Sequence, residues 1–189
     1  MLKKTKLMSH LIYYGYYGGS CDDDLPLHIC NECTTPEHGR VRSVAFIKKT
    51  FAFTDPSNPQ EWRNGIINRD IIIIPEVLGS CNGGEPVEGT GYGDQQSKIT
   101  GYNFEVAFKD PNYNDNAGFY NSLKRNRNLL IAYRTETKTH MSTNTVSIVP
   151  KSPISENLTD EVVWDVVVKF SQADLPEPFP TPEGIFECF

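Results

Sequence analysis

The sequence predicts a mainly β protein: one β-rich domain, a β-sandwich or barrel of roughly seven to nine strands with one or two short helices. Aromatic and β-branched residues alternate with polar residues in several runs, which is typical of strands with one buried face. Clusters of Gly, Pro, Asn and Asp separate these runs, as expected of turns. In addition, a passage with the pattern of a strand, a turn and a helix occurs twice.

The composition fits a folded domain and argues against several other classes of protein. With 189 residues, of which 38% are hydrophobic, the chain can bury a sizeable core and is too apolar to be disordered. A net charge of −6 argues against a protein that grips nucleic acid by its phosphates. No run approaches the roughly 18–20 apolar residues of a membrane helix, so we expect no membrane partner. The five cysteines, an odd number, favour synthesis in a reducing, intracellular compartment over a secreted disulfide framework.

Residues 1–40 are expected to form an N-terminal arm or irregular subdomain. They contain the run YYGYYGGS, in which four tyrosines lie among glycines. Tyrosine covers a large contact area at a low entropic cost, so we predict that these side chains contact a neighbouring subunit. The four are Tyr13, Tyr14, Tyr16 and Tyr17.

The same arm carries a candidate zinc site. Cys30 and Cys33 have the Cys-x2-Cys spacing that one tetrahedral zinc ion can bind. Cys21 with His28 or His38 would supply the second pair of ligands. Zinc would contribute most to a segment that has no core of its own. No second closely spaced pair is present, so a disulfide or free thiols are the alternatives.

The core domain is expected over residues 41–173 and begins with a strand region and a helix. Residues 41–53 alternate well enough for one or two strands, which end at Asp55 and the proline after it. Asn58 has the features of an N-cap, with Pro59 at the first helical position, so a short helix or turn is predicted to follow through Gly65.

The next segments are a strand and a glycine-rich loop. Residues 71–78, IIIIPEVL, predict a strand that is buried on both faces, with Pro75 at an edge or a bulge. Residues 79–96 contain six glycines and no apolar periodicity, which predicts a long loop without regular structure. Such a loop in a compact domain is usually functional, and we expect Tyr92 to contact a neighbouring subunit. The loop lacks the Gly-Lys-Ser/Thr ending of a nucleotide-binding loop.

The second half predicts further strands and a second helix. Residues 97–110 have the pattern of a long strand, and residues 116–127 that of a helix with basic residues near its C-terminus. Residues 129–150 predict a hairpin with its turn near residues 142–144. Residues 161–170, EVVWDVVVKF, predict the last strong strand.

Residues 174–189 are expected to form an extended C-terminal arm. Four prolines make this segment semi-rigid and prevent it from adding to the centre of a sheet. Phe179 and Phe186 would be poorly sheltered on an isolated tail. We therefore expect the arm to dock either on its own domain or on a neighbouring subunit, with these two phenylalanines as contacts.

The repeated passage covers residues 51–66 and 106–123. Each copy has an aromatic strand that ends in Ala-Phe-Xaa-Asp-Pro, followed by polar residues and a short aromatic segment. Asp55 and Asp110 occupy matching positions. The repeat indicates either a duplication within one domain or two uses of Asp-Pro as a common turn opener.

No group of residues has the arrangement of a catalytic site. The four histidines are scattered, and none lies near a recognisable nucleophile. The paired carboxylates occur in segments with the pattern of solvated turns or strand ends. We therefore expect no enzymatic activity and no catalytic residues.

Three segments resemble virion structural proteins of crAss-like and related Bacteroidetes phages. They are RVRSVAFIKKTFAFTDPSNPQEW, GYGDQQSKITGYNFEVAFKDPNYNDN and EVVWDVVVKFSQADLPEPFPTPEGIF. The resemblance extends over roughly residues 40–187 and lies in the style and order of the segments rather than in a mechanistic motif.

This resemblance implies a tail-tube-like fold and a place in the virion, as a tail or connector component of the conduit between portal and tail tip. It implies a homo-oligomeric ring with neighbouring tail, portal or ring proteins, through which DNA passes without specific binding. We expect residues 9–20, 79–96 and 174–189 to make the contacts between subunits, because paired edges and arms close a ring.

The main alternative is a β-sandwich module that recognises a glycan or a protein. The 79–96 loop and exposed tyrosines would form its binding surface, with aromatic stacking on sugar rings as the physical basis. Binding to glycans that depends on Tyr92 or Tyr102 would favour this alternative.

Overall fold

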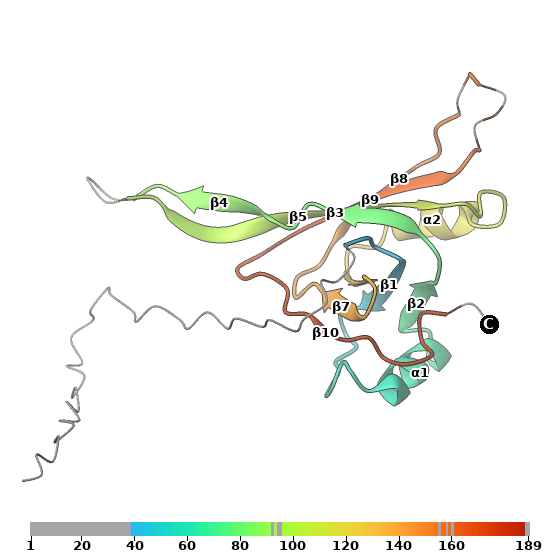
Figure 1. The fold of residues 1–189 in the computed structure, drawn as a ribbon, viewed down its shortest axis with the longest axis horizontal. Helices are drawn as coiled ribbons and strands as arrows, with labels where there is room; N and C mark the ends of the chain where they lie inside the picture. The colour runs from blue at the N-terminus through green and yellow to red at the C-terminus, as the bar shows by residue number, and fades with distance from the viewer. Residues whose placement is uncertain are drawn as a thin grey trace, which may run out of the picture. The chain divides into compact units, whose positions relative to one another are not determined.

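Two antiparallel sheets and two helices make up the described part of the chain (Figure 1). In the computed structural model, the described residues are 39–91, 93, 96–154, 156–157, 159 and 161–187. All of them belong to the second of the two units into which the chain divides, Met1–Thr35 and Pro36–Phe189. The prediction of a mainly β fold with one or two short helices is confirmed, and the described residues contain two.

Each sheet has five strands. The order in the first sheet is β10-β7-β6-β1-β2, and in the second it is β3-β5-β9-β8, with β4 also paired to β5. The first sheet consists of β1 (Ser43–Lys48), β2 (Ile71–Ile74), β6 (Leu129–Arg134), β7 (Lys138–Met141) and β10 (Phe179–Pro180). The second consists of β3 (Leu78–Cys81), β4 (Glu85–Gly89), β5 (Lys98–Asp110), β8 (Ser147–Lys151) and β9 (Trp164–Gln172). The helices are α1 (Pro59–Ile67) and α2 (Ala117–Leu123).

The main core lies between the two sheets. On β5, the alternation of side chains buries Phe104, Val106 and Phe108, while Glu105 and Ala107 between them are less buried. Phe46 of β1 approaches Phe108 across the core, with ring centroids 6.5 Å apart. Phe104 stacks on Phe170 of β9 at 4.9 Å. The even-numbered residues of β5 from Phe104 onward and of β9 from Val166 onward therefore face the core.

The opposite face of the first sheet is buried as well. Ala45 and Ile47, the alternate residues of β1, pack with Trp62 of α1 and with Ile185 and Phe186 near the C-terminus. The rings of Trp62 and Phe186 lie 5.3 Å apart. The first sheet is thus covered on its outer side by α1 and by the C-terminal segment.

The four-isoleucine strand β2 departs from the prediction. Ile71 and Ile74 are buried, but the side chain of Ile72 is 44% exposed. The reason is topological, because β2 is an edge strand that pairs only with β1. The placement of Pro75 at an edge is consistent with this position, since proline cannot donate to a ladder.

The residues at the start of α1 determine where this helix begins. Of the predicted short helix or turn, the structure shows a helix. The Asn58 side chain accepts a hydrogen bond from the N–H of Gln60 at 3.0 Å, and Pro59 is the first helical residue. Trp62 is buried and donates from its indole nitrogen to the carbonyl of Pro56 at 2.8 Å.

Two predictions in the second half are wrong in detail. The second helix covers Ala117–Leu123 and so ends earlier than expected. The predicted hairpin over 129–150 is in fact β6 paired with β7, after which the chain crosses to the other sheet as β8. The Ser142 hydroxyl accepts the N–H of Ile131 at 3.0 Å, so a side chain completes the ladder where the chain leaves the first sheet.

The two copies of the repeated passage form the same kind of turn but lie in different topologies. The Asp55 carboxylate accepts the N–H of Ser57, and the Asp110 carboxylate accepts the N–H of Asn112, each at 2.9 Å. A helix follows in both cases. However, α1 connects two paired strands of the first sheet, whereas α2 carries the chain from β5 to the other sheet. The topology therefore favours two uses of one turn motif.

Candidate assembly surface

The β4–β5 hairpin extends beyond the rest of the second sheet (Figure 1). Residues 98–103 of β5 pair with β4, whereas β9 pairs with β5 only from Tyr102 to Asp110. Among the described residues, 87–89 and 98–101 therefore form a ladder of two strands only. Residues 85–89 and 98–101 are called the ribbon below. Because an isolated two-stranded hairpin is marginally stable at best in water, this ribbon would gain stability from a surface to pack on.

A kink between β3 and β4 sets the direction of the ribbon. Both strands pair with the same edge of β5, and residues 82–84 interrupt them. The side-chain oxygen of Asn82 accepts the N–H of Glu105 at 2.9 Å, and its amide donates to the Asn103 carbonyl at 3.3 Å. A side chain thus takes over hydrogen bonds that a regular strand would make with its backbone.

The two glycines after Asn82 allow this kink. Gly83 and Gly84 have φ values of +76° and +96°, which L side chains rarely adopt. A Cβ atom on Gly84 would also lie 2.6 Å from the ring of Phe104, whereas one on Gly83 would meet no atom within 4 Å. Only Gly84 is therefore required both for its backbone conformation and for close approach.

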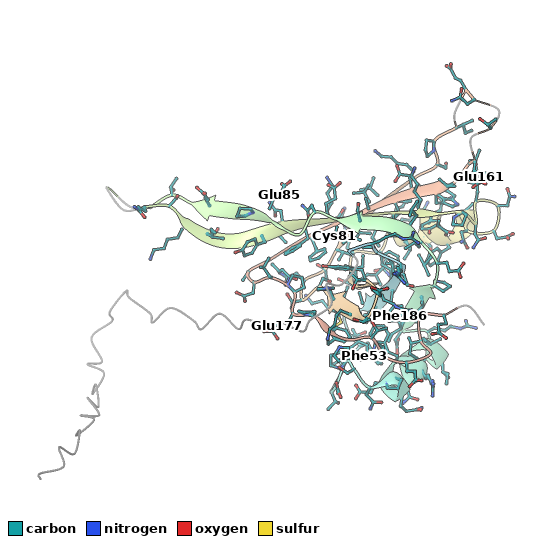
Figure 2. All side chains as sticks on the ribbon, viewed as in Figure 1. Phe53, Cys81, Glu85, Glu161, Glu177 and Phe186 are labelled. Carbon is teal, nitrogen blue, oxygen red and sulfur yellow. The ribbon has the colours of Figure 1, made fainter. Side chains whose placement is uncertain are left out.

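The ribbon exposes apolar and charged side chains together. Val87 and Ile99 are 38% and 56% exposed, although both are β-strand residues that are commonly found packed. Glu85 and Glu88 are also exposed and lie on the same ribbon as Lys98. Figure 2 shows Glu85 on the ribbon, away from Phe53 and Phe186 in the outer layer of the first sheet.

The outward side of the second sheet continues this surface with cross-strand rows. One row is apolar and joins Ala107, Val167 and Val149 across β5, β9 and β8. In a neighbouring row, Glu105 and Lys169 form an ion pair at 2.9 Å. Such an exposed pair stabilises the subunit little and is available for contacts with another chain.

A groove of about 1610 Å³ lies at the end of β5 opposite to the ribbon. It is bounded by the start of the first sheet, by the Lys109 end of β5 and by the segment before β9. Its apolar lining includes Leu78 and Ile154, which are 57% and 79% exposed. Its charged lining residues are Arg40, Arg42, Glu76, Lys109, Arg134, Glu161, Asp165 and Glu187.

One side chain in the wall of the groove has a polar atom without a hydrogen-bond partner among the described residues. Within the described ranges, the Nε atom of Arg134 is buried and has no hydrogen-bond acceptor. Arg42 forms an ion pair with Glu136 at 3.1 Å beside it. A buried donor without an acceptor costs about 1–3 kcal/mol, so this guanidinium lowers the stability of the subunit locally.

The C-terminal segment forms a strap over the first sheet. Residues 179–187, called the strap below, pair with β7 through β10 and bury Ile185 and Phe186. The hydroxyls of Thr139 and Thr181 hold it further at 3.0 Å. Of the two expected places for this arm, the structure shows docking on its own domain, and Phe186 is a core residue there. Phe179 is half-buried in the same cluster, so neither ring extends freely toward a neighbouring subunit.

Most other residues expected at subunit contacts or at zinc lie outside the described residues. They are Tyr13, Tyr14, Tyr16, Tyr17, Tyr92, Cys21, Cys30, Cys33 and His38. Among the residues that the structure describes, no group of three or more His, Cys, Asp or Glu side chains could hold a metal ion. The zinc site in the N-terminal arm therefore stays a prediction.

Two buried tyrosines carry the strongest electrostatic perturbations. Burial raises the pKa of Tyr133, and the neighbouring Cys81 thiol, 3.8 Å from its hydroxyl, adds to the effect. Burial, followed by the hydrogen bond to Asp110, likewise raises the pKa of Tyr120. Both hydroxyls therefore keep their protons at neutral pH, so Tyr133 cannot act as a base toward Cys81.

Sequence reasoning missed the ribbon and the groove. The prediction that residues 79–96 lack regular structure is wrong, because β4 and the end of β3 lie within them. The available signal was two short segments, EPVEG and SKITG, on either side of seven residues that include two glycines, which is compatible with a hairpin that has a long loop. No local pattern could indicate the groove, since its walls come from distant segments of the chain.

Comparison of the chain with protein-family models, with curated proteins and with solved structures gives no match. The described helices include none that is long and apolar enough to span a membrane. The case for a function therefore depends on the ribbon, the exposed sheet face and the groove.

Proposed function

We propose that this chain is a non-enzymatic structural subunit that assembles with copies of itself into a ring or tube. The observation that carries the proposal is the ribbon. Among the described residues, 98–101 pair with β4 alone, and Val87 and Ile99 are exposed. A monomer gains nothing from holding such a hairpin away from its core. A subunit that packs the hairpin on a neighbour gains both buried apolar area and a supported strand pair.

The resemblance to virion structural proteins gives this assembly a setting. A ring or tube in the tail or connector of a phage would form a conduit for DNA, with neighbouring tail, portal or ring proteins above and below. The net charge of −6 supports a conduit that DNA passes without adhering, because an acidic protein does not neutralise phosphates. In that setting the protein is made in the bacterial cytoplasm and functions in the virion.

The exposed tyrosine surface of the alternative binding module receives less support. Tyr102 is half-buried and packs against Phe104, with ring centroids 6.3 Å apart. A ring in such a position supports the core rather than offering a free face for stacking on a sugar.

The test is the mass of the purified protein over a concentration series, measured by light scattering and accompanied by negative-stain images. We expect rings, tubes or discrete oligomers for the wild type, and a shift to monomer for V87D/I99D. The matched control is I67D, which adds a charge at a 76% exposed position on α1, away from the ribbon. A wild-type monomer at the highest concentrations, or equal assembly of V87D/I99D, would contradict the proposal.

A further inference from the structure

We propose that the groove at the Lys109 end of β5 receives the ribbon of a second copy of this chain. The inference rests on the proposed function and deepens it, because it names both halves of one contact. It follows from the size of the groove, from the side chains on the two surfaces and from their positions along β5.

The size of the groove favours a polypeptide as its occupant. Pockets for small molecules usually enclose about 300–1,000 Å³, whereas this groove measures about 1610 Å³. It lies between the first sheet, β5 and the segment before β9, and it is partly open to solvent. A two-stranded ribbon of the same chain could enter a groove of this size.

The side chains of the two surfaces complement one another. The ribbon offers Val87 and Ile99, and the groove offers Leu78 and Ile154, all of which are exposed in the single subunit. Contact between these two pairs would remove apolar area from water on both sides.

The charges also match in kind. The ribbon carries the carboxylates of Glu85 and Glu88 and the ammonium group of Lys98, and the groove is lined by four basic and four acidic side chains. A carboxylate of the ribbon is a suitable acceptor for an exposed basic side chain of the groove, such as Arg40 or Lys109. Lys98 of the ribbon can form an ion pair with one of the acidic residues that line the same groove.

The positions along β5 decide which copy supplies the ribbon. The ribbon lies at the Lys98 end of β5, and the groove lies at its Lys109 end. The 13 residues of this strand span about 40 Å at roughly 3.3 Å per residue. A ribbon therefore cannot enter the groove of its own subunit. The contact joins two different patches, so it is heterologous and propagates head to tail into a ring or a filament.

A heterologous contact has a signature that substitutions can expose. V87D/I99D removes the donor surface but leaves the groove intact, whereas L78D/I154D removes the receiving surface but leaves the ribbon intact. Each variant alone should be monomeric, because every head-to-tail contact then lacks one half. An equimolar mixture should form a 1:1 heterodimer and nothing larger, because only one productive contact remains.

The experiment measures molar mass by light scattering for the wild type, both variants, their mixture and the control I67D. All four substituted groove and ribbon positions are exposed in the subunit, and matched urea midpoints would establish that the variants fold. We expect each variant to weaken self-association at least tenfold and the control to assemble as the wild type does. In the wild-type assembly, amide exchange of residues 85–89 and 78–79 should slow together.

The outcomes separate this inference from the proposed function. If the wild type assembles and L78D/I154D assembles equally well, the groove is not the receiver and the docking inference is overturned, while assembly stands. The same conclusion follows if the two variants remain monomers when mixed. If the wild type itself stays monomeric at all concentrations, both the inference and the proposed function are overturned.

Discussion

Asp55 and Asp110 occupy matching positions in the repeated passage but differ in burial, which makes them a matched pair for measuring what burial adds. Asp55 is exposed and its carboxylate accepts the N–H of Ser57. Asp110 is only 1% exposed, and besides the N–H of Asn112 it accepts from the Asn116 amide at 2.8 Å and from the Tyr120 hydroxyl at 2.7 Å. We predict that D110A destabilises the protein far more than D55A does.

The magnitude follows from the hydrogen bonds. In D55A one surface bond is lost, and water can replace it, so the expected cost is about 0.5–1 kcal/mol. In D110A three bonds are lost, and the buried Tyr120 hydroxyl keeps no acceptor from this carboxylate. An unsatisfied buried group alone costs about 1–3 kcal/mol, so the sum is about 3–5 kcal/mol. Y120F removes only one of these bonds and should cost about 1–2 kcal/mol.

The assay is urea unfolding of the wild type, D55A, D110A and Y120F, followed by fluorescence and circular dichroism. The slope of the transition should stay constant, so that shifts in midpoint report stability. Because Asp110 and Tyr120 share one bond, the double variant D110A/Y120F should lose less than the sum of the single losses. Equal destabilisation by D55A and D110A, or additive losses in the double variant, would refute this account of the buried cluster.

Three further predictions concern the strap, the kink and high pH. F186A should cost about 3–5 kcal/mol in urea unfolding, because its ring is buried against Trp62; a loss under 1 kcal/mol would mean that the strap is not part of the core. G84A should destabilise by about 1–3 kcal/mol more than G83A in the same assay, because only its Cβ meets the Phe104 ring; equal effects would refute the close-approach argument. The free energy of unfolding should fall as the pH rises above about 10, the ordinary tyrosine pKa, because the unfolded chain then loses protons that Tyr120 and Tyr133 keep in the folded protein. The expected slope is about 1.4 kcal/mol per pH unit for each tyrosine, and Y133F should halve it in urea titrations at stepped pH.

The parts of the fold that could be predicted are those whose signals are local. The helix α1 is encoded within a few residues by the Asn58 cap and Pro59. Likewise, β5 and β9 carry a period of two, because one face of each meets the core. Such patterns are written into consecutive residues, so they can be recognised without knowing the rest of the chain.

The parts that could not be predicted depend on distant partners. Whether Ile72 is buried depends on a strand beyond β2, and there is none in the described sheet. The chain leaves the first sheet at Ser142 because its hydroxyl meets Ile131, eleven residues earlier, and no period in the sequence marks that change. The docking of Phe186 depends on Trp62 of α1 and Ala45 of β1, which lie more than a hundred residues away in the chain.

The sequence pattern did not predict the ribbon, and the reason bears on function. In a strand with one face buried in its own subunit, apolar and polar residues alternate. In contrast, β4 is exposed at four of its five residues, so no buried face produces such an alternation in its sequence. A hairpin that packs on a neighbour is expected to look irregular from the sequence of one chain, because its buried face is defined only in the assembly.

The kink at Asn82 strengthens this argument. A side chain replaces the ladder, and Gly84 lies where a Cβ would meet Phe104, so the direction of the ribbon is fixed rather than left free. A hairpin held in one direction with Val87 and Ile99 exposed is already ordered before it binds, which lowers the entropic cost of association.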